Sequence, residues 1–213
     1  MPIPFPTRTA LVLGSLVLFG TGPGVAQDRT DDGLPPAGYG RLNQDALSAG
    51  VRTTSLDIRV TILQESALRL LNQDSYASLH RLVESKRAQI DSIASYYGVH
   101  DPGLLMVQYF ALVEGTRFDA QLLTANINTL FLNPVAIVPL TTSIQSDRLG
   151  RGKSAAGIYM FTDALTPYLP MTFTYGATAV IEWSRGRTEN LLRERNRIQS
   201  RVIQNQSGGE GGQ

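Results

Sequence analysis

One stretch of the sequence ends like a phosphate-binding loop, with Gly152, Lys153 and Ser154 in direct succession. Such a loop needs a glycine five residues before this triplet, so that backbone N–H groups wrap the phosphates, and it leads into a helix. Here that position holds Asp147, whose charge repels a phosphate, and the following residues, Ala155–Phe161, have the apolar composition of a strand. We therefore expect an exposed turn between two strands and no nucleotide binding.

Few residues are available for nucleophilic or metal chemistry. Residues 152–157 contain one residue too many for the G-x-S-x-G nucleophile elbow, and only His80 and His100 are available as a base. The sequence has no cysteine, no H-E-x-x-H motif and no close pair of histidines. These absences exclude disulfides and thiolate sites, and they predict a protein without a metal or another cofactor.

Two glutamates remain as candidates for acid–base catalysis. Glu114 follows the apolar segment Leu104–Val113, and Glu182 lies in the last expected strand, Thr178–Trp183. A glycosidase uses two carboxyl groups within about 10 Å of each other, contributed by distant segments. A carboxylate-dependent hydrolase of envelope glycans, with Glu114 and Glu182 as catalytic residues, is therefore the alternative function. The commoner explanation is that both residues are solvated charges at strand ends, without a catalytic role.

A locally basic segment lies near the C-terminus, at residues 185–205. Good helix formers predict a helix, Thr188 can cap its start, and Leu191, Ile198 and Val202 form a narrow apolar stripe. Its candidate ligand-binding residues are Arg187, Arg193, Arg195, Arg197 and Arg201. They could bind an anionic envelope polymer or lipid headgroups, but a solvated helix packed lightly on the domain is the favoured interpretation. Nucleic acid is not expected, because the segment lacks interleaved aromatic residues.

Residues 1–26 have the three parts of a secretory signal peptide. Arg8 precedes the apolar run Ala10–Gly20, and Gly24 and Ala26 supply the small residues before the cleavage site. The run is shorter than the roughly 20 residues that cross a bilayer, although an uncleaved anchor is the alternative. We expect export to the periplasm or the outside of the cell. After cleavage, the chain is not expected to be an integral membrane protein.

The rest of the composition is that of an ordinary globular protein. The 213 residues include 19 Lys and Arg against 18 Asp and Glu, a balance that argues against a surface made for nucleic acid. Asp, Gly and Pro in residues 27–52 predict a flexible linker, and the glycines of residues 206–213 predict a disordered tail. A folded domain is expected over residues 53–184.

Within this domain, apolar periodicity predicts one long helix and a series of short strands. Apolar residues spaced three and four apart predict the helix over residues 74–97, inside a helical insertion at 65–98, lying on its own sheet or, less favoured, on a coiled-coil partner. Pro134 and Pro139 predict an edge or bulged strand. The expected strands are Leu56–Leu63, Leu104–Val113, Phe118–Thr124, Leu130–Leu140, Ala155–Phe161, Met171–Tyr175 and Thr178–Trp183.

These elements predict a mainly β fold, an immunoglobulin-like β-sandwich of about seven strands, with one long inserted helix and a C-terminal helix. Since none of the catalytic motifs is complete, we expect an exported, non-enzymatic binding or structural module of the bacterial cell envelope. Its partner is expected to be another envelope protein, at the edge strand near Pro134–Pro139, or an anionic envelope polymer at the basic helix.

Overall fold

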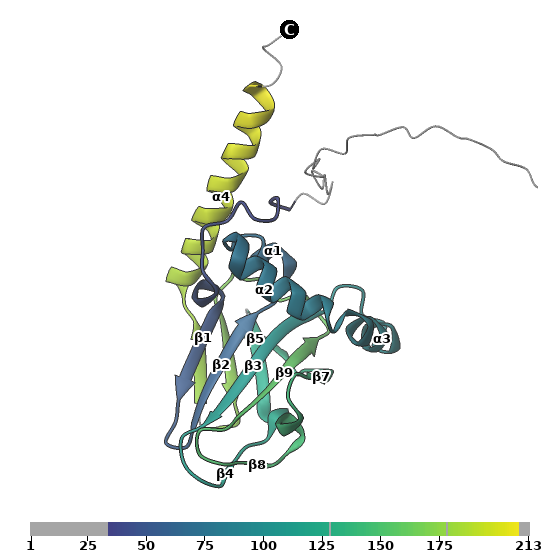
Figure 1. The fold of residues 1–213 in the computed structure, drawn as a ribbon, viewed down its shortest axis with the longest axis vertical. Coiled ribbons are helices and arrows are strands. Elements are labelled where there is room, and N and C mark those ends of the chain that lie inside the picture. Colours follow the sequence, from purple (N-terminus) through teal and green to yellow (C-terminus); the bar gives the residue numbers. More distant parts are fainter. Residues whose placement is uncertain (1–33, 128, 178, 209–213) are drawn as a thin grey trace, which may run out of the picture.

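The computed structural model describes residues 34–127, 129–177 and 179–208. The expected signal peptide, the first part of the expected linker and the last five residues of the tail lie outside these ranges. Within them the chain forms antiparallel sheets and helices in similar proportion (Figure 1). The expectation of a mainly β protein is therefore wrong, because helices account for more of the chain than the sequence pattern indicated.

Two antiparallel sheets form the centre of the molecule. The first has the order β1 (Ser48–Arg52), β2 (Leu56–Ile62), β3 (Gly103–Ala111), β9 (Ser154–Phe161) and β7 (Ala136–Pro139). The second has the order β11 (Ala179–Trp183), β10 (Met171–Tyr175), β5 (Leu123–Ile127) and β6 (Leu130–Leu132). A short pair, β4 (Thr116–Arg117) and β8 (Arg148–Leu149), lies at one end. The seven expected strands are thus too few.

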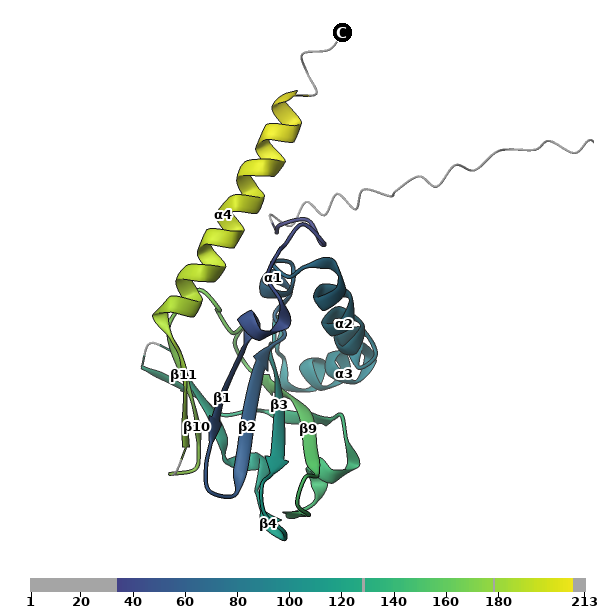
Figure 2. The same cartoon turned by 60° about the vertical axis from the view of Figure 1, so that its left-hand side comes forward.

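The first sheet is covered on both faces. Tyr109 of β3 contacts Tyr175 of β10, with ring centres 5.6 Å apart, so the alternate residues Leu105 and Val107 also face the second sheet. Met106, on the opposite face, borders α2 (Gln73–Glu84). Figure 2 shows β10 and β11 on one side of the first sheet and the helices of the segment between β2 and β3 on the other. This double burial explains the nearly continuous apolar sequence of β3.

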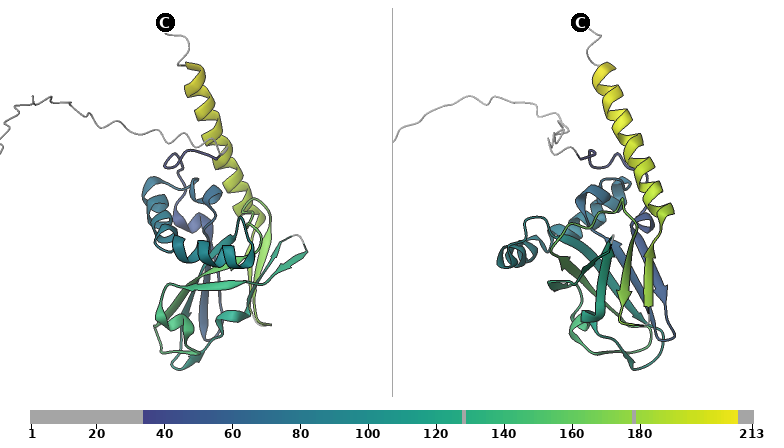
Figure 3. Two further views of the ribbon diagram at one scale, coloured as in Figure 1. Left: turned by 90° about the vertical axis from the view of Figure 1, so that its right-hand side faces the viewer. Right: turned by 180° about the vertical axis from the view of Figure 1, so that it is seen from behind.

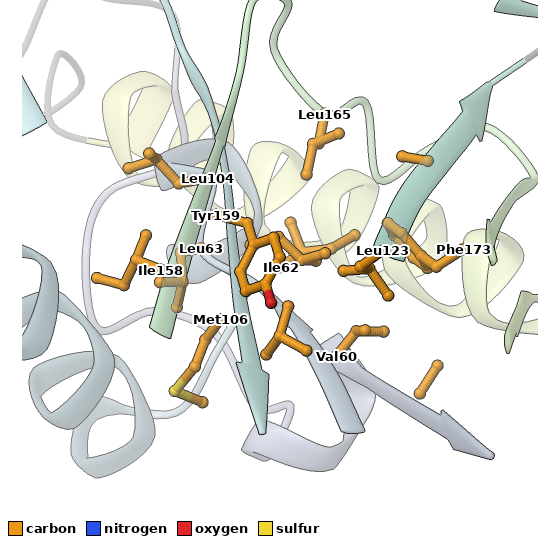
Figure 4. Packing of buried hydrophobic residues seen from close by; sticks show 14 of the residues in the cluster. Val60, Ile62, Leu63, Leu104, Met106, Leu123, Ile158, Tyr159, Leu165 and Phe173 are labelled. Atoms are coloured by element: carbon orange, nitrogen blue, oxygen red, sulfur yellow. The ribbon is translucent and has the colours of Figure 1, made fainter. Parts of the chain in front are cut away.

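One apolar core joins the two sheets and the helices. Figure 4 shows Val60, Ile62 and Tyr159 of the first sheet beside Leu123 and Phe173 of the second. The aromatic rings of Tyr159 and Phe173 are completely buried. A core of this size holds the fold without disulfides.

The long helix expected over residues 74–97 is two helices, α2 and α3 (Arg87–Tyr97). The break falls at Ser85 and Lys86, where the Ser85 hydroxyl donates to the carbonyl of Leu82 and the Lys86 N–H bonds three residues back to Val83. A serine that bonds the backbone in this way competes with the helical hydrogen bonds. The short α1 (Glu65–Leu68) precedes them, so the insertion at 65–98 contains three helices.

The expected linker contains structure that the sequence did not indicate. A 3-10 turn, η1 (Gln44–Leu47), leads into β1, which pairs with β2 from Ser48 opposite Thr61 to Arg52 opposite Asp57. The segment expected as one strand over 130–140 is divided at residues 133–135 into β6 and β7, which belong to different sheets. The edge position predicted from its prolines is confirmed, since β7 is the last strand of the first sheet.

The C-terminal helix α4 (Arg185–Gly208) follows β11 directly. Its buried positions, Thr188, Leu191, Glu194 and Ile198, recur every three or four residues and so lie on one face. Figures 1 and 3 show that its first turns pack against the body, beside the segment that leads to η1, and that its later turns extend past the other helices. Within the described ranges, no helix is both long enough and apolar enough to cross a membrane.

Candidate functional site

The stretch that resembled a phosphate loop is a turn between β8 and β9. Gly152 has a φ of 72°, in the left-handed region that favours glycine, and the Lys153 N–H donates to the carbonyl of Gly150 at 3.0 Å. The side chain of Lys153 is exposed. The following residues form β9, so the turn leads into a strand as predicted, and not into the helix that phosphate binding requires.

The two candidate catalytic glutamates are not brought together. Glu114 is exposed in the turn after β3, and its carboxylate accepts the N–H of Arg151 at 2.8 Å. Glu182 is exposed on β11 opposite Thr172, close to the start of α4. The β4–β8 end, where Glu114 lies, and the α4 end are opposite ends of the molecule in Figure 1. This separation does not provide the shared cleft that a glycosidase pair needs.

The two histidines lie apart from the serine turn. His80 is stacked on Tyr76, with ring centres 5.0 Å apart, and its Nδ1 lies 3.4 Å from the carboxylate of Glu65. The same carboxylate accepts the Tyr76 hydroxyl at 3.0 Å and the Arg69 Nε–H at 2.8 Å. This cluster joins α1 to α2. His100 is exposed beyond α3, and among the described residues no three His, Asp or Glu side chains gather to hold a metal ion.

Three of the five candidate arginines on α4 hold the helix against the body. Arg187 donates to the carbonyl of Asp45 at 3.0 Å, and its guanidinium lies 5.7 Å from the centre of the Trp183 ring. Arg195 lies 5.2 Å from the centre of the Tyr168 ring. These cation–π contacts bind the first turns of α4 to neighbouring segments.

Arg197 and Glu194 form the tightest part of this contact. Glu194 is 8% exposed, and its carboxylate accepts the Arg41 N–H at 2.8 Å and the Arg197 Nε–H at 2.8 Å. Arg197 also donates to the carbonyl of Tyr39 at 2.8 Å. The Arg197 hydrogen bond, assisted by the Arg41 N–H, lowers the pKa of the Glu194 carboxyl against the opposing effect of burial. The pair thereby fastens α4 to the segment Tyr39–Leu42.

The remaining two arginines, Arg193 and Arg201, are exposed, and the Arg193 Nε–H reaches the carbonyl of Glu189 at 3.4 Å. The helix therefore does not present five arginines to a ligand on one face. Charge counting alone could not reveal this, because the partners of Arg187 and Arg197 come from residues 39–45, where the sequence indicated only a linker.

A second candidate site consists of apolar residues on and near the two edge strands β6 and β7. β6 and β7 are each the last strand of their sheet, and residues 133–135 connect them. On β6, Leu130 is 54% exposed and Phe131 is 73% exposed. A depression of about 480 Å³ lies near β7, and its lining includes Phe118, Ile137 and Pro139. Apolar side chains on an edge strand are a feature of interaction surfaces.

No family model, no curated protein and no solved structure matches the chain. The interpretation of the site therefore depends on the geometry of these residues.

Proposed function

We propose that this chain is an exported, non-enzymatic binding module of a bacterial cell envelope that docks on another envelope protein through strand β6. The observation that carries the proposal is the exposure of Phe131, 73%, on the edge strand of an antiparallel sheet. With the adjoining Leu130, 54% exposed, it forms an exposed apolar pair on an edge that can accept a further strand.

Two features favour β6 over β7 as the docking edge. An edge strand offers unpaired N–H and C=O groups to a strand of a partner, while alternate side chains supply specificity. In β7, Pro139 has no N–H to offer, and proline on an edge opposes such pairing. In β6, no proline intervenes, and Phe131 lies opposite Asn126 on the face that alternates with the core-facing pair Leu132 and Ala125.

We also infer that the two larger sheets form a β-sandwich. Support comes from the contact between Tyr109 and Tyr175 across the sheets and from the single core to which both contribute. An immunoglobulin-like order of the strands remains a prediction from the number and spacing of the strands alone.

Export is the part of the proposal that rests on the sequence only. The expected signal peptide, residues 1–26, precedes the described ranges. Expression in a bacterial host with recovery of the envelope fraction should give a mature chain that begins at Gln27, as read by mass spectrometry of its N-terminal peptide. A chain that stays in the cytoplasm with Met1–Ala26 attached would contradict export.

Docking is tested with a photo-crosslinking amino acid placed at Phe131 and, as a matched control, at Val180. Val180 is also an exposed apolar residue of the second sheet, 55% exposed, on the strand at its opposite edge. We expect position 131 to give one discrete adduct with an envelope protein and position 180 to give none. In addition, Leu130→Asp should abolish the adduct while circular dichroism stays unchanged. Equal labelling at both positions, or labelling at neither, would refute docking on β6.

A further inference from the structure

A depression of about 350 Å³ lies on the outer surface where β1 and β2 meet the base of α4. Three arginines from three different elements line it, namely Arg52 of β1, Arg59 of β2 and Arg187 of α4. Two of them, Arg52 and Arg59, were not among the candidates that the sequence offered. The three arginines lie in separate segments of the sequence, and the fold brings them to one depression.

Paired residues of β1 and β2 form the bottom of this depression. Gly50 stands directly opposite Arg59, and Arg52 stands opposite Asp57, on the face that alternates with the buried pairs of the core. Gly50 has no side chain, so the backbone beside Arg59 is uncovered. A Cβ added at Gly50 would lie 2.9 Å from the carbonyl oxygen of Ile58, closer than a Cβ normally comes to an oxygen atom, so a larger residue would force the backbone to shift.

The charges in the lining leave two guanidinium groups for a ligand. Arg52 is engaged with Asp57 at 3.2 Å. Arg187 is bound to a carbonyl oxygen and not to a carboxylate, and it is steadied over the ring of Trp183. Arg59 is exposed and makes no ion pair or side-chain hydrogen bond with any described residue. Asp45 is the other acid in the lining, so three arginines against two aspartates leave an excess of positive charge.

We propose that this depression binds an oxyanion, the carboxylate or phosphate group of an acidic polymer, between Arg59 and Arg187. A guanidinium presents several N–H donors in a planar fork that matches the two oxygens of a carboxylate or phosphate. Arg187 is already held in place by its contacts, so ordering it costs a ligand little. The depression is shallow and open, which suits one charged group of a long chain more than an enclosed small molecule.

Arg59→Gln is the decisive variant, because Arg59 has no partner in the described fold and its removal should leave stability unchanged. The full mature chain is titrated with an oligogalacturonate, which supplies carboxylates, and in a second arm with polyphosphate, which supplies phosphates. We expect at least one probe to bind, with affinity that falls as salt rises, and Arg59→Gln to weaken that binding at least tenfold. The probe that binds more tightly identifies the source of the oxyanion.

Arg193→Gln is the matched control, since Arg193 is exposed on α4, does not line the depression, and carries the same charge. It should bind as the unaltered protein does. A third variant, Arg187→Lys, keeps the charge but loses the fork, and we expect an intermediate loss. Three outcomes would overturn the proposal: binding of neither probe by the unaltered protein, unchanged binding by Arg59→Gln, or an equal loss in Arg193→Gln. The β6 crosslinking test is independent of each of these outcomes.

Discussion

The hydroxyl of Tyr109 lies 2.8 Å from the hydroxyl of Tyr159, and Tyr159 in turn donates to the carbonyl of Ala120 at 2.7 Å. Because Tyr159 gives its only proton to Ala120, it must accept the proton of Tyr109. The order of this buried chain is therefore fixed, from Tyr109 to Tyr159 to the backbone. A parallel bond from the Asp119 N–H to the Tyr175 hydroxyl, 2.9 Å, ties the same loop to the second sheet.

This order makes the two tyrosines unequal. Tyr159→Phe removes the hydrogen-bond partner of both the Ala120 carbonyl and the Tyr109 hydroxyl. Tyr109→Phe removes only the donor to the Tyr159 hydroxyl, which still donates to the Ala120 carbonyl. Leaving a buried polar group unsatisfied costs about 1–3 kcal/mol. We expect Tyr159→Phe to lower the free energy of unfolding in urea by about 2 kcal/mol and Tyr109→Phe by about half as much. Equal losses would contradict the proton order, and Tyr96→Phe, at an 83% exposed position, serves as control.

The same cluster predicts a loss of stability at alkaline pH. Burial raises the pKa of Tyr109, assisted by the neighbouring Tyr159, and burial also raises the pKa of Tyr159. In the unfolded chain a tyrosine releases its proton near pH 10. Above about pH 10 the folded state therefore holds more protons than the unfolded state, and the free energy of unfolding falls as pH rises. Below about pH 10 these tyrosines contribute no pH dependence.

Urea unfolding followed from neutral pH into the alkaline range measures this effect. The double variant Tyr109→Phe, Tyr159→Phe should show a shallower alkaline decline than the unaltered protein, although it starts from a lower stability. The same slope in both proteins would show that other groups cause the decline.

The Glu194 contact predicts a separate, acidic dependence. The pKa of this carboxyl is lowered in the folded state, chiefly by the hydrogen bond from Arg197. Its contribution is therefore complete above the pKa of an unfolded glutamate, about 4.3, and is lost as pH falls through the folded value. We expect Glu194→Ala to lower the free energy of unfolding by about 2 kcal/mol. It should also raise the rate of amide hydrogen exchange in the first turns of α4. Glu189→Ala, which breaks an exposed pair with Arg185, should change stability by no more than about 0.5 kcal/mol.

The turn at residues 150–153 predicts two contrasting substitutions. Lys153 is exposed and has only backbone bonds, so Lys153→Ala should alter the free energy of unfolding by no more than about 0.5 kcal/mol. Gly152 holds a positive φ, so Gly152→Ala should cost about 1 kcal/mol although nothing lies within 4 Å of the added carbon. Thermal unfolding of both variants measures the difference, and a costly Lys153→Ala would show an unrecognised role for the lysine.

The sequence predicted the strands that have a clear apolar pattern, among them the edge strands β11 and β7, and it missed the edge strand β1. The continuous apolar run of β3 and the alternation of Met171, Phe173 and Tyr175 in β10 correspond to buried positions, and both strands are observed. β1 was missed because Ser48, Gly50 and Arg52 alternate with only two apolar residues, Ala49 and Val51, which is too weak a pattern to signal a strand. Pairing with β2 forms this strand, and a local pattern does not report such pairing.

The helical region shows a related limit. The spacing of apolar residues continues across Ser85 and Lys86, because α2 and α3 both bury residues in the one core of the molecule, among them Leu79, Val83 and Ile90. Periodicity reports which face is buried and not whether the helix axis bends. The sequence likewise located the five arginines of α4 but could not tell the ones that pack on the body from the exposed ones. The contacts with Asp45, Tyr168 and Tyr39 that distinguish them depend on tertiary structure.

The crossing of α4 with the segment Tyr39–Leu42 has a mechanical consequence. Arg41 precedes the first strand and Arg197 follows the last, yet both meet at Glu194. A pulling force applied between Tyr39 and Val202 would be carried by this junction, because the chain between these points runs through the sheets and returns to the same place (Figure 1). The hydrogen bonds of Glu194 and Arg197 would be loaded first and the Arg187–Asp45 bond after them, so this junction would shield the sheets from tension.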